Sequence, residues 1–286
     1  MSTGVKLGVG TLALFVLSYI GFHQVYLMEQ RHHTGAALVA SHPMPRLFDH
    51  SAVAPYATGM ERQSAQATRL MQGWWSSHGT ARHDREFAAW LRSTLPPPPS
   101  ASARAAEAKH LENLARARTV AGTNAAQWLQ TYGGRDVWAY YEQKQAVGLP
   151  QHDQHLQHRE LGRMMAMSRK VGRALASRLQ QSAPDLLDPA LRQGAAAAPP
   201  GRTCPCSYPG AAEVSAAAGE TFLGFLYPGQ ATQYQQLAEE LGYAQLYMGN
   251  HLPSDVDAGA LLGDMVGDYF LVTRGNGRPD QVAASR

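Results

Sequence analysis

The sequence contains few charged residues and almost no cysteine. Asp, Glu, Lys and Arg make up 16% of its 286 residues, whereas 44% are hydrophobic. A disordered chain would carry more charge and less apolar material, so we expect a folded core in one large domain or two small ones. The formal net charge of +3 comes from cations spread without a Lys/Arg-rich run, and no nucleic-acid partner is expected.

The two cysteines, Cys204 and Cys206, occur in the run Cys-Pro-Cys. A single intervening residue does not match the CxxC spacing of a redox site or a zinc knuckle. The pair is either a strained disulfide in an oxidising compartment or two unpaired thiols in a loop. The sequence leaves both alternatives open.

Long apolar runs are absent except at the N-terminus. The stretch from Leu7 to Phe22 is uncharged, and its apolar character continues with two interruptions to Met28. About 20 such residues can cross a bilayer as a helix. Because no cleavage site directly follows, residues 1–33 predict an uncleaved signal anchor in the inner membrane. We expect the rest of the chain to be a periplasmic domain, although the flanking charges are too balanced to fix the orientation alone.

The remainder shows helical spacing of apolar residues and no convincing β alternation, so an all-α, antiparallel helical bundle is expected. The prolines at 96–99 must end one helix. The predicted organisation is an irregular tether at 34–58, a helical extension at 59–100, a main domain at 101–273 and a flexible tail at 274–286. Helices are expected at about 60–77, 84–95, 101–131, 136–147, 152–182, 211–227, 231–247 and 254–272.

The segment that carries chemistry is Gly249-Asn250-His251-Leu252-Pro253-Ser254-Asp255. A His and an Asp four residues apart at a helix start lie on one face. The carboxylate can hold one imidazole nitrogen and leave the other free to attack phosphorus. A purely local alternative is that Ser254 or Asp255 caps the helix while His251 sits in a loop.

This segment and the Gly- and Ala-rich stretch after it resemble the third signature of the type 2 phosphatidic acid phosphatase and vanadium haloperoxidase superfamily, Ser-Arg-x5-His-x3-Asp. The resemblance implies the helical core of that superfamily. It also implies that His251 is the nucleophile, or the vanadate ligand, and that Asp255 orients it. The Ser and Arg of the signature fall at Ala244 and Gln245, so its guanidinium is missing.

The second signature of the same superfamily, Pro-Ser-Gly-His, resembles the run that begins at Tyr208-Pro209-Gly210. No His stands at the position of the general acid. Glu213 is the titratable group nearby, and it could donate a proton only if its pKa were raised.

The first signature, Lys-x6-Arg-Pro, aligns on Pro184. This register places its Arg at Ala183 and its Lys at Ala176, so both cations are missing. Arg173 lies one helical turn before Ala176 and is a candidate compensating cation.

Phosphoryl transfer without a metal depends on cations that neutralise the equatorial oxygens. Loss of one such group typically lowers the rate ~10²-fold or more. We therefore expect a catalytically impaired, membrane-anchored binding or assembly subunit with no cofactor and with a membrane protein as a candidate partner. Three alternatives stay open: an active phosphomonoesterase with displaced cations, a haloperoxidase, and a metal site at His152, His155 and His158.

Overall fold

The computed structural model describes residues 37–45, 47–191, 206–275 and 277–285. Every regular element in these ranges is a helix, and their β structure is limited to one isolated bridge between Ser182 and Cys206. The predicted all-α class is therefore confirmed for the described residues. The predicted anchor at 1–33 lies outside them, and none of the helices that are described has the length and apolar character to cross a membrane.

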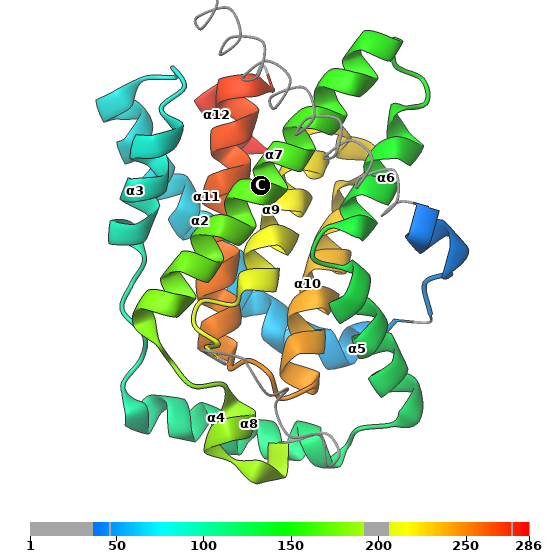
Figure 1. The fold of residues 1–286 in the computed structure, drawn as a ribbon, viewed down its shortest axis with the longest axis vertical. Helices are drawn as coiled ribbons and strands as arrows, with labels where there is room; N and C mark the ends of the chain where they lie inside the picture. The colour runs from blue at the N-terminus through cyan, green and yellow to red at the C-terminus, as the bar shows by residue number, and fades with distance from the viewer. Residues whose placement is uncertain (1–36, 46, 192–205, 276, 286) are drawn as a thin grey trace, which may run out of the picture.

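The helices pack as a bundle, with α9 and α11 side by side near its centre (Figure 1). The predicted positions of α3, α6, α7, α9, α10 and α11 agree with the structure to within a few residues. Short 3-10 turns occur at Pro189–Leu191 and Pro228–Gln230. The bounds are α2 His50–His78, α3 Asp84–Thr94, α4 Ala101–Arg116, α5 Val120–Tyr132, α6 Asp136–Ala146, α7 Gln151–Leu179, α8 Pro184–Leu187, α9 Ala211–Leu226, α10 Ala231–Tyr247, α11 Pro253–Arg274 and α12 Pro279–Ala284.

The irregular tether predicted for 34–58 is wrong at residues 37–41 and from residue 50 onward, where the chain is helical. α2 begins at His50 and continues through Pro55. Val53 and Ala57 are buried on either side of this proline. Burial of these apolar side chains stabilises the helical turn around Pro55, which the proline by itself would destabilise.

The single helix predicted for 101–131 is also wrong, because the chain breaks between α4 and α5. The Thr119 hydroxyl accepts a hydrogen bond from the Gly122 amide at 3.0 Å and so caps a new helix. Arg118, within the break, donates hydrogen bonds to the carbonyls of Tyr247 and Leu191. These tertiary contacts fix the break, and a helical pattern in the sequence does not show them.

The flexible tail predicted for 274–286 is wrong for the described residues of that range. α12 packs against α11 and α2, and its Val282 side chain is buried. The Gly277 amide donates to the Leu271 carbonyl at 3.0 Å and turns the chain back. Val282 is the buried apolar residue of this short helix. One apolar residue in a polar segment does not predict a helix from sequence.

Glycines set the close approach of α9 and α11. Gly259, Gly263 and Gly267 follow one another at four-residue spacing along α11. A Cβ atom on Gly263 would lie 2.6 Å from the Val214 carbonyl oxygen of α9. The two backbones therefore pack at a distance that larger side chains would prevent.

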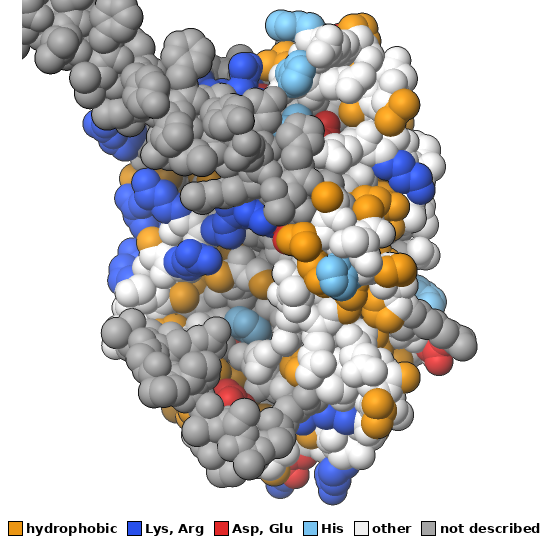
Figure 2. All heavy atoms as spheres, turned by 45° about the vertical axis from the view of Figure 1, so that its right-hand side comes forward, with side chains coloured by type: hydrophobic (Ala, Val, Ile, Leu, Met, Phe, Trp, Pro, Cys, Tyr) orange, Lys and Arg blue, Asp and Glu red, His pale blue; other side chains and the backbone are white. Residues whose placement is uncertain are grey.

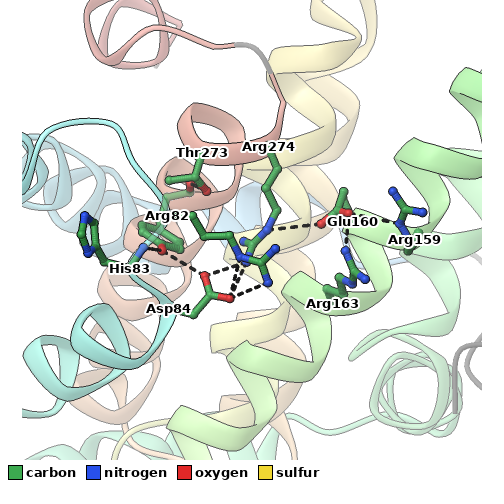
Figure 3. A network of polar contacts seen from close by, with 9 residues as sticks. Arg82, His83, Asp84, Arg159, Glu160, Arg163, Thr273 and Arg274 are labelled. Atoms are coloured by element: carbon green, nitrogen blue, oxygen red, sulfur yellow. Dashed lines mark hydrogen bonds and ion pairs between the residues drawn. The ribbon is translucent and has the colours of Figure 1, made fainter. Parts of the chain in front are cut away.

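A charged network fixes the C-terminal end of α11 (Figure 3). The buried Arg274 guanidinium lies 2.7 Å from Asp84 of α3 and 3.4 Å from Glu160 of α7. Glu160 also accepts a hydrogen bond from Arg163 at 2.7 Å, and Arg274 lies over the Phe270 ring at 3.8 Å. This network joins three helices at the end of α11 opposite to Asp255.

Candidate functional site

The sequence-predicted residues gather where four helix ends meet. The C-terminal ends of α7 and α10 and the N-terminal ends of α9 and α11 lie at one end of the bundle, and α4 runs across that end (Figure 1). The Gly210 amide donates to the Asp255 carbonyl at 2.7 Å, which ties the starts of α9 and α11 together. Gly249 makes the turn between α10 and α11 with a φ of 73°, a conformation that favours glycine.

His251 is half-buried in this turn. Its Nδ1 atom lies 3.0 Å from the Ser207 carbonyl oxygen. Since a carbonyl can only accept, Nδ1 carries the proton, and Nε2 of the neutral ring keeps its lone pair. Burial lowers the pKa of His251, and the nearby Asp255 charge only partly opposes this shift. The imidazole is therefore neutral and retains a nucleophilic nitrogen.

Asp255 is fully buried and does not hold the imidazole directly. Its Oδ1 atom accepts from Arg104 at 2.6 Å, and its Oδ2 atom accepts from the Leu252 amide at 2.8 Å. Among the described residues, its carboxylate makes no hydrogen bond to His251. The orienting bond that the sequence implied is therefore replaced, because the Ser207 carbonyl occupies the ring nitrogen and Asp255 caps α11.

Arg104 is the functional residue that the sequence analysis missed. It is 3% exposed on α4. Its Nη2 atom donates to the Ser207 hydroxyl at 3.0 Å and to the Ser182 carbonyl at 3.2 Å, while Nη1 binds Asp255. Ala108 and Leu111, at i+4 and i+7 from Arg104, are buried on the same helix face. The sequence did offer one signal, namely that Arg104 lies on the apolar face of its helix.

Glu213 and Gln245 form a buried pair between α9 and α10. The Gln245 Nε2 atom donates to Glu213 Oε2 at 3.1 Å. Burial raises the pKa of Glu213 well above its ordinary range, and the charge of Asp264 raises it further. This shift favours the protonated, uncharged carboxyl. Being fully buried, the Glu213 side chain has no surface for a substrate to reach.

The remaining predicted positions add no charge to the site. Ala176 lies in the last part of α7, and Ala183 immediately precedes α8. Arg173, the candidate compensating cation, lies on the exposed side of α7. The structure describes no hydrogen bond or ion pair from Arg173 to His251 or Asp255.

Cys206 is disulfide-bonded, while Cys204 lies outside the described residues. An isolated β-bridge joins Cys206 to Ser182, and the Ser207 amide donates a hydrogen bond to the Gln181 carbonyl. These two contacts bring the Ser207 segment against the end of α7. This placement puts the Ser207 hydroxyl and carbonyl between Arg104 and His251.

The three histidines at the start of α7 do not converge. His158 is buried, with Nδ1 2.7 Å from Glu142, whereas His152 and His155 are exposed. In the part of the chain that the structure describes, no three His, Cys, Asp or Glu side chains are grouped to hold a metal ion. The three-histidine metal site is therefore not formed.

A separate cavity of about 510 Å³ opens between α2, α9, α10, α11 and α12. Its charged lining consists of the carboxyl groups of Glu61, Glu220, Glu239 and Asp264, and none of its described lining residues is Lys, Arg or His. A phosphate would be repelled there.

The His251 site can therefore supply a neutral imidazole nucleophile and the Arg104 guanidinium, which is already paired with a carboxylate. Comparison of the chain with protein-family models and with curated proteins found no match.

Proposed function

We propose that the chain is a phosphatase-like protein of the type 2 phosphatidic acid phosphatase superfamily that has lost most of its catalytic power. It is anchored in the inner membrane by residues 1–33, and its helical domain serves as a periplasmic binding or assembly subunit. The family assignment rests on the motif resemblance around Tyr208-Pro209-Gly210 and His251. The impairment rests on one observation, the engagement of Arg104 by Asp255 at 2.6 Å.

The charge of the Arg104 guanidinium is offset by the Asp255 carboxylate, and burial disfavours the charged forms of both His251 and Glu213. A phosphate ester could attract Arg104 only by competing with Asp255, which would then be buried without its partner. Breaking a buried ion pair in this way costs about 3–5 kcal/mol. That cost corresponds to roughly 10²- to 10⁴-fold weaker binding of the anion.

The frame around the site is nevertheless held by hydrogen bonds between distant segments, which supports a retained binding role. The buried Tyr208 hydroxyl donates to the Pro96 carbonyl at 2.8 Å, and Ser254 donates to Glu107 at 2.7 Å. These contacts hold the segment before α9 against the proline run that precedes α4, and the start of α11 against α4 itself. A scaffold of this kind can present a surface to a partner without turnover.

An active phosphomonoesterase is the second candidate, because the Nε2 atom of His251 retains its lone pair. In that reaction Nε2 would bond to phosphorus as the ester P–O bond breaks, and the departing alkoxide would take a proton from water. Water would then hydrolyse the phosphohistidine. Arg104, rather than Arg173, would be the displaced cation that contacts the phosphoryl oxygens.

A hydrolysis assay separates the two candidates. The full chain is purified in detergent and given a phosphomonoester, with His251→Ala as the test variant and His152→Ala, at an exposed position on α7, as the matched control. We expect no turnover above the level of His251→Ala. Turnover that survives in His152→Ala and disappears in His251→Ala would refute the impaired-site proposal.

The assembly role needs a different measurement. The chain, purified from its native membranes in mild detergent, should elute in a complex larger than its own mass of 31.0 kDa plus the micelle. A lone monomer under these conditions would count against an assembly subunit, even if hydrolysis were absent.

A further inference from the structure

A second group of cations lies outside the His251 site. Arg169 and Arg173 are one turn apart on α7, and Arg135 directly precedes α6. Arg169 lies close enough to Arg135 and Arg173 to feel their positive charges. It also lies close enough to feel the negative charge of the Asp136 carboxylate. Asp136 is already engaged, because its Oδ1 atom lies 2.6 Å from both Nε and Nη2 of Arg135.

Arg169 is the unusual member of the group. Its Nη1 atom is shielded from solvent and has no hydrogen-bond partner among the described residues. Burial lowers the pKa of this guanidinium, and the charges of Arg135 and Arg173 lower it further. A buried donor without an acceptor, beside two like charges, is costly. An anion between the three guanidinium groups would remove that cost.

The surrounding surface favours the same kind of ligand. Arg159, Arg163, Lys170 and Arg173 fall within an arc of about 80° on α7, at 3.6 residues per turn. Lys and Arg side chains gather along one side of the face drawn in Figure 2, over the region of α7. This stripe raises the local concentration of anions near Arg169.

We propose that Arg135, Arg169 and Arg173 bind a phosphate-type oxyanion, carried either by a soluble phosphate compound or by the headgroup of an anionic lipid. Three guanidinium groups and one carboxylate leave an excess of positive charge, which favours the dianion of inorganic phosphate and also the monoanion of a lipid phosphodiester. The planar guanidinium forks suit the several oxygens of a tetrahedral anion. The site uses no residue of the His251 centre and does not depend on its activity.

Binding to the full chain in detergent tests the proposal. Inorganic phosphate is titrated in one arm. In the other arm, micelles are doped with phosphatidylglycerol or, as a neutral reference, phosphatidylcholine. The test variants are Arg169→Gln and the exposed Arg173→Gln, which should fold even if the first does not. Lys170→Gln removes the same charge from the same stripe and is the matched control.

We expect saturable binding in the wild type, about tenfold or more weaker in Arg173→Gln and changed much less in Lys170→Gln. Saturation by inorganic phosphate assigns the site to soluble phosphate compounds. Saturation by phosphatidylglycerol alone assigns it to lipid headgroups. No binding of either probe to the wild type would overturn the proposal. Equal losses in Lys170→Gln and Arg173→Gln would also overturn it, because diffuse charge would then explain the binding.

Discussion

Replacing Arg104 with methionine removes the guanidinium that joins α4 to three other segments while keeping the apolar length of the side chain. Asp255, fully buried, would keep the Leu252 amide as its donor but lose its charged partner. Breaking a buried pair by removing one member costs about 3–5 kcal/mol. For a chain of this size, the melting temperature should fall by roughly 6–20 °C.

Urea-induced unfolding of the full chain measures this change, with Arg116→Met as the control. Arg116 lies on the same helix but is largely exposed, so its loss should cost less than about 1 kcal/mol. The double variant Arg104→Met/Asp255→Asn removes the stranded charge and should recover much of the lost stability. A loss below about 1 kcal/mol in Arg104→Met, or a double variant less stable than the single one, would refute the reasoning.

Three further changes probe the helix contacts and the buried carboxyl groups. Arg274→Met should destabilise the fold by about 3 kcal/mol in urea unfolding, because it breaks a buried network, whereas the exposed Arg278→Met should have little effect. Gly263→Ala should cost about 1–3 kcal/mol through overpacking against α9, while Gly148→Ala, which meets no neighbouring atom, should be tolerated. Burial raises the pKa of Glu240 from 4.5 to about 7, so Glu240→Gln should flatten the dependence of melting temperature on pH.

The sign of the pH effect follows from proton binding. Between about pH 4.5 and 7, the folded protein holds a proton on Glu240 that the unfolded chain has released. Stability contributed by this group therefore falls as the pH rises through that window. Unchanged pH profiles in Glu240→Gln would contradict the assignment. Equal losses of stability in Arg274→Met and Arg278→Met would contradict the role given to the charged network. Equal losses in Gly263→Ala and Gly148→Ala would contradict the overpacking argument.

The helices with strong local signals were predictable from the sequence. The four prolines end α3, and the continuous apolar pattern of α10 and α11 fixes both helices within two residues. The break at Thr119 and the short α12 escaped prediction, because each is decided by contacts with distant parts of the chain. The early start of α2 escaped for the same reason, since Val53 and Ala57 are held by the core.

The candidate site was predictable only in part. The spacing of the third signature identified His251 and Asp255. The sequence also showed that Gln245 replaces the signature arginine and that no histidine stands near Glu213. The sequence could not show that Asp255 would pair with Arg104, because 151 positions separate the two residues. Nor could it show that the pKa of Glu213 is raised, since that shift depends on burial among α9, α10 and α11.

The separation between Arg104 and its acceptors has a consequence for biosynthesis. Ser182, Ser207 and Asp255 follow it by 78, 103 and 151 positions. A chain made from its N-terminus exposes α4 long before the last of these acceptors leaves the ribosome. Until then the guanidinium stays hydrated, and this end of the bundle cannot close. Docking of α4 should therefore be a late event, and a nascent chain stalled before Asp255 should remain sensitive to protease around α4.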